Sequence, residues 1–132
     1  MKVQVGDALP ELAIPVTTTL IVAGAIASRD YQDVHHDRDL AHERGSPDIF
    51  MNILTTNGLV GRYVTDWAGP EAIVKKVAIR LGVPNYPGDT MLMRGTVTAA
   101  REDEEGRAVT VSVTGSNERG DHVTGTVDLE LP

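Results

Sequence analysis

The stretch from Ser46 to Pro70, SPDIFMNILTTNGLVGRYVTDWAGP, decides the fold. Ser46 suits the cap of a helix and Pro47 its first position, and Gly69-Pro70 would end the helix. The pattern therefore predicts one long helix of roughly 18 to 20 residues, about 30 Å long at 1.5 Å per residue. The apolar residues recur at spacings of three and four, which describes one broad helical face: Ile49, Phe50, Ile53, Leu54, Leu59, Val60, Tyr63, Val64 and Trp67.

After Pro70 the hydrophobic period changes from that of a helix to that of strands. We expect strands at residues 72–81, 90–101, 107–115 and 122–131, with short polar turns between the last three. Strands joined in this way form an antiparallel meander. One long apolar helix followed by such strands predicts an α+β fold, in which an antiparallel sheet wraps around a single central helix.

The residues before Ser46 are less regular. Pro10 and Pro15 argue against a long element at the start of the chain. Thr17 to Ala27 is rich in Thr, Val and Ile, which predicts a buried strand. Asp33 to Arg44 is densely charged, and its acidic start predicts a short helix.

Length and composition exclude several classes of protein. The 132 residues fit one domain spanning residues 1–132, and the absence of cysteine excludes disulfides, thiolate metal sites and a cysteine nucleophile. The net charge of -7, from 12 basic and 19 acidic residues, argues against a nucleic-acid partner. The sequence shows neither a secretory signal pattern nor an apolar run near the roughly 20 residues of a spanning helix. We therefore expect a cytoplasmic protein without a membrane partner.

The stretch from Arg29 to Asp37, RDYQDVHHD, concentrates groups that can move protons. Asp30 and His35, five positions apart, can converge across a turn and hold one water molecule. Histidine titrates near neutral pH and a carboxylate can orient it, so such a pair suits acid–base chemistry. From the residues alone, a solvated charged loop remains an alternative. A metal site is a further alternative, and its ligands would come from Asp33, His35, His36, Asp37 and His42.

The same residues resemble the signature of the MaoC-like (R)-specific enoyl-CoA hydratases. That signature runs Asp, any residue, Asn, Pro, an aliphatic residue and His, with a small residue six positions later. Asp30 and His35 match its two reactive positions, Val34 matches the aliphatic residue and Ala41 the small one. The resemblance covers nearly the whole chain and implies a single hotdog fold.

The chain departs from the family signature at three loop positions. Gln32 and Asp33 stand in place of Asn and Pro, and Arg29 stands where a glycine usually precedes the Asp. Gln32 and Asp33 shape the loop more than they take part in the reaction. Within the family, four segments resemble the small subunit of the heteromeric hydratases with which actinobacteria degrade steroid side chains: DVHHD (33–37), DIFMNIL (48–54), YVTDWAGP (63–70) and GDHV (120–123).

The resemblance implies a reversible syn addition of water to the 2,3 double bond of an enoyl-CoA. The implied substrate is a steroid side-chain enoyl-CoA of cholesterol or steroid degradation. Asp30 and His35 would activate the water, and the backbone N–H of Asn52, where relatives often have glycine, would bind the thioester oxygen. No metal and no cofactor are implied, because the substrate itself carries coenzyme A.

The length of the chain implies a partner. Enzymes of this type place two hotdogs side by side, and this chain supplies one, so the resemblance implies a second MaoC-like hotdog subunit in a heterodimer or heterotetramer. A non-catalytic hotdog subunit that stabilises a catalytic partner is one alternative, although the presence of both Asp30 and His35 favours the hydratase. A hotdog thioesterase is another, but it would carry its carboxylate on the long helix, and Asp48 and Asp66 lie only at the ends of that helix.

Overall fold

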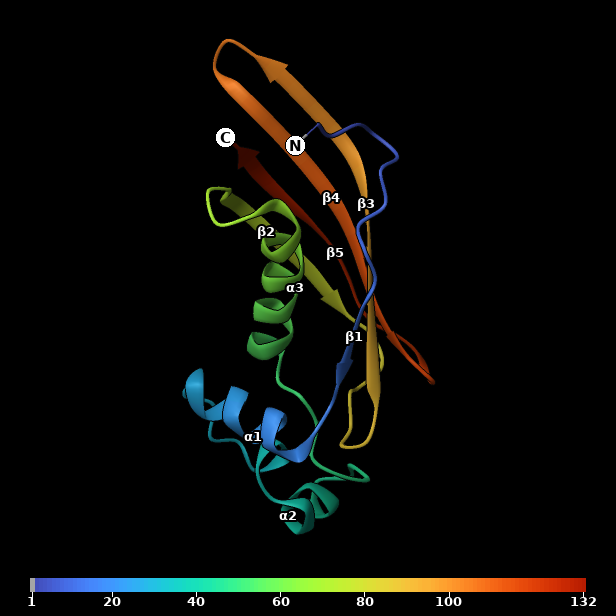
Figure 1. Cartoon of the computed structure of the whole chain (residues 1–132). Coiled ribbons are helices and arrows are strands. Elements are labelled where there is room, and N and C mark those ends of the chain that lie inside the picture. The colour runs from blue at the N-terminus through green and yellow to red at the C-terminus, as the bar shows by residue number, and fades with distance from the viewer. Residues whose placement is uncertain (1) are drawn as a thin grey trace.

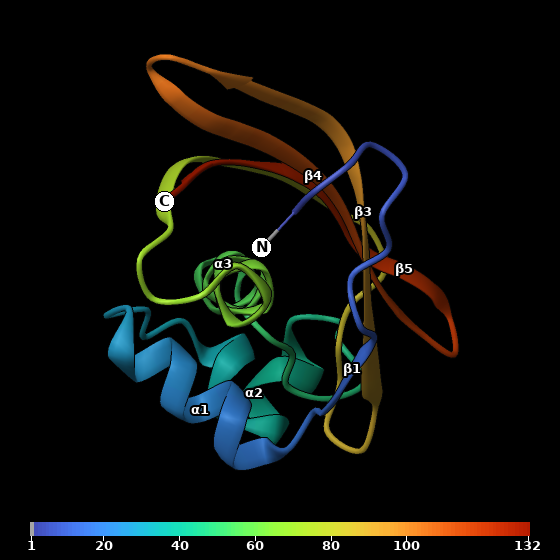
Figure 2. The same ribbon diagram turned by 45° about the horizontal axis from the view of Figure 1, so that its top comes forward.

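The computed structural model describes residues 2–132, in which an antiparallel sheet curves around one helix (Figures 1 and 2). The sheet has the order β1-β3-β4-β5-β2, and helix α3 (Ile53–Ala68) lies in its concave face (Figure 2). The predicted α+β arrangement and the predicted meander of the last three strands are confirmed. The strands are β1 (Leu12–Pro15), β2 (Ile73–Leu81), β3 (Thr90–Asp103), β4 (Gly106–Asn117) and β5 (Gly120–Leu131).

The core lies between α3 and the sheet. Alternation along β4 buries Val109, Val111 and Val113, while the residues between them are only half-buried. Helix α3 adds Val60 and Val64 to the same apolar cluster. Each such side chain contributes about 1.5–3 kcal/mol when it leaves water. The helix is therefore fixed against the sheet mainly by burial of aliphatic side chains.

The predicted start of the long helix is wrong. Helix α3 has 16 residues and begins at Ile53, with Asn52 as its N-cap. The preceding segment stays non-helical because its backbone bonds to other parts of the chain: Phe50 N–H donates to the Val34 carbonyl and Met51 N–H to the Asn85 carbonyl. The Ser46 hydroxyl donates to the Asp48 carbonyl within its own turn, so it is not a helix cap.

The strand predicted from Thr17 to Ala27 is also wrong. This segment forms helix α1 (Thr18–Ala27), and the Thr17 side chain caps it by accepting a hydrogen bond from the Leu20 N–H. An apolar run of this length fits a buried strand or a buried helix equally well. Contact with α3 decides for the helix, because Gly24 allows α1 to approach Thr55 closely.

The charged segment after Asp30 is helical in two pieces. They are a 3-10 turn, η1 (Asp33–His35), and helix α2 (Arg38–Glu43), whose N-cap is Asp37. The predicted short helix is thus present, with an interruption between the two pieces. None of the helices found within residues 2–132 has the length and apolar character needed to cross a membrane.

Candidate active site

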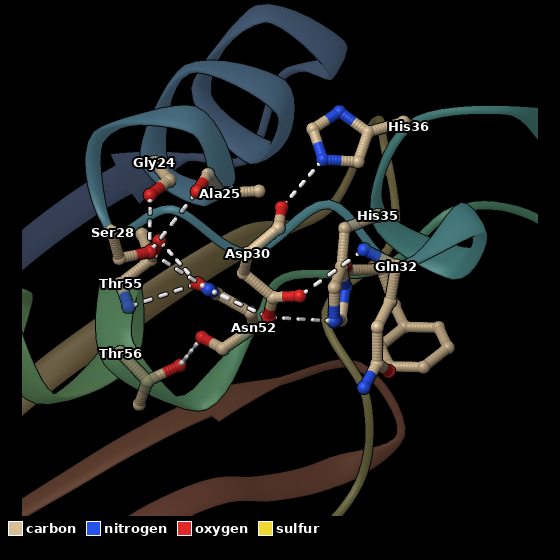
Figure 3. Close-up of polar contacts among 11 residues, drawn as sticks. Gly24, Ala25, Ser28, Asp30, Gln32, His35, His36, Asn52, Thr55 and Thr56 are labelled. Atoms are coloured by element: carbon tan, nitrogen blue, oxygen red, sulfur yellow. Dashed lines mark hydrogen bonds and ion pairs between the residues drawn. The ribbon is translucent and has the colours of Figure 1, made fainter.

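The C-terminal end of α1 positions Asp30. The Asp30 N–H donates to the Ala25 carbonyl at 2.9 Å, and the Arg29 N–H donates to the Ile26 carbonyl at 3.0 Å. Arg29 has a φ of 56°, in the left-handed region that glycine adopts most easily. This pattern is a Schellman helix end, which explains why a glycine is usual at this position. The helix end directs Asp30 toward the start of α3 (Figure 3).

His35 lies on η1 and faces Asp30. Its Nδ1 lies 2.7 Å from the Phe50 carbonyl, and its Nε2 lies 3.3 Å from Asp30 Oδ2. A carbonyl oxygen can only accept, so Nδ1 carries the hydrogen and Nε2 of the neutral ring presents a lone pair to the carboxylate. The pair can therefore share one proton or accept both hydrogens of one water molecule.

The Asp30 carboxylate has two further hydrogen bonds. Asn52 Nδ2 donates to Oδ2 at 3.1 Å, and the Gln32 N–H donates to Oδ1 at 3.2 Å. The Asn52 bond is the largest cause that holds the pKa of Asp30 below its usual value. It outweighs the opposing effect of burial, and the Gln32 bond and the two nearby histidines add to it. Asp30 is therefore ionised at neutral pH, the form that can accept a proton from water.

The other histidines of this segment bond to backbone carbonyls. His36 Nε2 lies 2.6 Å from the carbonyl of Asp30, and His42 Nε2 bonds to the carbonyl of Pro47. The hydrogen bond of His36 therefore supports the backbone of Asp30. No group of three or more His or carboxylate side chains that could hold a metal ion occurs within residues 2–132. The geometry gives the metal alternative no support.

The structure brings Asn52 next to Asp30, but through its side chain. The residue is 2% exposed and caps α3, and its amide bonds directly to the Asp30 carboxylate. Its backbone N–H lies at the start of α3, where the helix dipole favours negative charge. The role of that N–H toward a thioester oxygen remains a prediction.

A groove of about 380 Å³ opens beside Asp30 and His35. It is also lined by Leu81 at the end of β2, by the following residues to Pro84 and by His122 on β5. His122 is buried, with Nδ1 2.7 Å from the Val83 carbonyl and Nε2 2.8 Å from the Thr56 hydroxyl. Burial lowers the pKa of His122 and keeps its ring neutral. This histidine therefore links the wall of the groove to α3.

The carboxylates at the ends of the predicted long helix lie away from Asp30 and His35. Asp48 precedes α3 and accepts a hydrogen bond from the Ile49 N–H. Asp66, in the last turn of α3, pairs with Arg62, and its side chain is 61% exposed. Neither residue lines the groove, and the thioesterase alternative gains nothing from the structure.

Comparisons with known proteins agree with this fold. Residues 4–119 match the MaoC like domain, and the chain belongs to this family. It is 55% identical over 127 residues to the beta subunit of 3-oxo-4,17-pregnadiene-20-carboxyl-CoA hydratase from Mycobacterium tuberculosis (strain ATCC 25618 / H37Rv). The alignment covers 96% of this chain and 95% of that protein. The family resemblance drawn from the sequence is confirmed.

Solved structures match the whole fold. A chain of the ChsH1–ChsH2 complex from Mycobacterium tuberculosis is 55% identical and superposes with a TM-score of 0.92, covering 100% of both chains. The (R)-hydratase of A. caviae involved in PHA biosynthesis is 22% identical, with a TM-score of 0.88 and 98% of each chain covered. The second likeness shows the fold alone, and the predicted hotdog fold is confirmed.

Proposed function

We propose that this chain is the catalytic hotdog subunit of a heteromeric enoyl-CoA hydratase that acts on a steroid side-chain enoyl-CoA. The observation that carries the proposal is the pairing of Asp30 and His35, whose Oδ2 and Nε2 atoms lie 3.3 Å apart at the edge of an open groove. The 55% identity to the beta subunit of a 3-oxo-4,17-pregnadiene-20-carboxyl-CoA hydratase supports the steroid substrate. The reaction belongs to cholesterol or steroid degradation.

The reaction is the addition of one water molecule across the conjugated double bond. Asp30 and His35 hold the water, and as its oxygen bonds to Cβ one water proton passes to the pair. The same pair then gives a proton to Cα, so the two residues return to their starting state. The oxygen bonds to Cβ and the proton bonds to Cα on the same face of the double bond, which gives syn addition. General acid–base groups of this kind contribute typically 10²–10⁴-fold in rate.

Negative charge develops on the thioester oxygen as water adds. A backbone N–H at Asn52, at the start of α3, is the donor that fits this oxygen, and the helix dipole supports it. One such donor contributes roughly 3–4 kcal/mol in comparable enzymes. The chemistry needs no metal and no resident cofactor, because coenzyme A enters as part of the substrate.

A second hotdog subunit completes the enzyme. β2 pairs with β5 on one side only and forms an edge of the sheet. Its exposed apolar side chains include Ile73 and Leu81, and Leu81 also lines the groove. A partner hotdog that continues the sheet from β2 would close the groove around the acyl group. The ChsH1–ChsH2 complex that contains the matched chain supports the presence of a partner subunit.

The test uses the complex purified from the native host. We expect Asp30→Asn and His35→Ala to lower the hydration rate by about 10²–10⁴-fold with the melting temperature retained. Asp33→Asn and His42→Ala are the matched controls, since both side chains lie outside the groove, and their rates stay near that of the unmodified complex. Normal hydration by either of the first two variants, with activity lost only on mutation of the partner, would favour the non-catalytic alternative.

The substrate is tested separately. The rate with a steroid 17(20)-enoyl-CoA is compared with the rate with crotonyl-CoA in the same complex. We expect a clear preference for the steroid, because the chain is 55% identical to the beta subunit of a 3-oxo-4,17-pregnadiene-20-carboxyl-CoA hydratase. A clear preference for crotonyl-CoA would contradict the steroid part of the proposal.

A further inference from the structure

The side chain of Asn52 forms four hydrogen bonds between α1, Asp30 and α3 (Figure 3). Nδ2 donates to Ser28 Oγ at 3.0 Å and to Asp30 Oδ2 at 3.1 Å. Oδ1 accepts from the Thr55 N–H at 3.0 Å and from the Thr55 hydroxyl at 2.5 Å. The residue is almost completely buried, so this amide is tied to its neighbours rather than to solvent.

The partners of the amide leave it one orientation. The Thr55 N–H can only donate, so the oxygen of Asn52 faces Thr55 and its NH₂ group faces the other way. The Ser28 hydroxyl donates to the Gly24 carbonyl at 2.7 Å and is therefore an acceptor for Asn52. One N–H of Asn52 thus goes to Ser28 and the other to Asp30. A donor fixed in this way is in place before any substrate arrives.

The amide acts on the oxygen of Asp30 that also faces His35. Oδ2 receives the Asn52 bond and lies 3.3 Å from His35 Nε2, whereas Oδ1 receives the Gln32 N–H. The two donors fix the plane of the carboxylate. A hydrogen bond to a charged acceptor also stabilises the charge. Asn52 therefore affects both the direction and the ionisation of Asp30.

Capping α3 does not by itself require asparagine. Aspartate and serine cap helices about as well, because either supplies an oxygen to the backbone N–H groups of the first turn. Compared with aspartate and serine, asparagine also has an NH₂ donor on the side of its amide that faces away from the helix. An aspartate here would place a second carboxylate against Asp30, and a serine would leave Asp30 without this donor. The choice of residue follows from Asp30 rather than from the helix.

We propose that Asn52 is a positioning residue of the Asp30–His35 pair, whose side-chain amide, oriented by Thr55 and Ser28, holds the Asp30 carboxylate facing His35 and stabilises its charge. This role rests on the proposed function, because a rate effect requires Asp30 to take the proton from water. It is separate from the role of the Asn52 backbone N–H, which every variant at this position retains.

The first measurement follows the ionisation of Asp30 directly. In the complex with its partner, a ¹³C NMR titration of the Asp30 carboxyl is compared among the unmodified chain, Asn52→Ser and Asn52→Asp. We expect Asp30 to titrate at higher pH in both variants, with a displacement of about one pH unit or more in Asn52→Asp, where a like charge is added. The matched control is Asn57→Asp, the same substitution within α3. We expect Asp30 to titrate at the same pH in this variant as in the unmodified chain.

The second measurement is the hydration rate as a function of pH. We expect the acidic limb of the kcat profile of Asn52→Asp to move to higher pH by the same one unit or more as the Asp30 titration, because kcat falls as Asp30 is protonated. A role limited to folding would lower the melting temperature and leave both pH profiles unchanged. A role limited to the oxyanion would lower kcat equally at every pH. Either of these results would overturn the proposal.

The two measurements also separate this proposal from the proposed function. A displaced Asp30 titration together with unchanged hydration would refute the catalytic role of Asp30 and the positioning role with it. An Asp30 titration that stays in place in Asn52→Ser, while Asp30→Asn still abolishes hydration, would refute the positioning role alone. Asn52→Ser retains the cap and adds no charge, so it remains informative if Asn52→Asp does not fold.

Discussion

Replacing Gly24 by alanine tests the contact that brings α1 against α3. A Cβ atom at this position would lie 2.2 Å from Thr55 Oγ1 and 2.8 Å from Thr55 Cγ2. These separations are well below the roughly 3.5–4.0 Å of favourable carbon contacts. Thr55 is β-branched, and its hydroxyl bonds to Asn52, so it has little freedom to turn aside. The helices must move apart by about 1 Å, or Thr55 must rotate and lose this bond.

The size of the effect follows from three terms. Overpacking costs about 1–3 kcal/mol, and loss of the Thr55–Asn52 hydrogen bond costs about 0.5–1.5 kcal/mol. Alanine in a helix gains about 1 kcal/mol over glycine. We therefore expect Gly24→Ala to lower the free energy of unfolding by about 0.5–3.5 kcal/mol. At Gly61 in α3 nothing lies within 4 Å of an added Cβ, so Gly61→Ala keeps only the gain of about 1 kcal/mol.

The assay is thermal and urea unfolding of both variants in the complex, together with the hydration rate. One kcal/mol corresponds to about 3–4 °C in melting temperature for a chain of this length, so the two variants should move in opposite directions. Gly24→Ala should also lose activity, because Thr55 orients Asn52. Thr55→Ala removes both clashing atoms and should recover part of the stability lost in Gly24→Ala. A rise in melting temperature for Gly24→Ala equal to that for Gly61→Ala would refute the close approach of the helices.

Two further predictions concern pH and backbone strain. Burial lowers the pKa of His122 from its usual 6.5, so the unfolded chain binds this proton first as the pH falls. The free energy of unfolding should therefore decrease below about pH 6.5 and level off below the native pKa. Urea unfolding between pH 5 and 8 should show this loss, and His122→Gln should remove its contribution while His42→Ala keeps it. Arg29→Gly should raise the free energy of unfolding by up to about 1 kcal/mol, because the left-handed conformation is costly for arginine; a fall in melting temperature would contradict this.

The sequence predicted the sheet better than the helix boundaries. Alternation of Val109, Val111 and Val113 with polar residues is a local signal, and it survives folding because one face of β4 is buried. The start of α3 depends instead on contacts from far along the chain. The backbone of Phe50 and Met51 bonds to other segments and keeps residues before Asn52 out of the helix. No local pattern reports those bonds.

The same distinction applies to the candidate site. Asp30 and His35 lie close in sequence, and the spacing alone places them within reach of each other. The side chain of Asn52 comes from 22 residues beyond Asp30, and His122 comes from another strand. The signal for Asn52 was present in the sequence, since asparagine is a strong helix cap. This preference identifies Asn52 as a cap only if the helix is known to begin at Ile53. Ser46-Pro47 indicated an earlier helix start.

The residues that line the groove come from different parts of the architecture. Asp30 follows the end of α1 and His35 stands on η1, whereas the lining residues Leu81 to Pro84 lie at the end of β2 and in the loop after it. Changes in the Leu81–Pro84 segment could therefore alter which acyl groups enter without moving Asp30 or His35. Natural or laboratory evolution of substrate range can act on the end of an edge strand while the reaction itself stays constant.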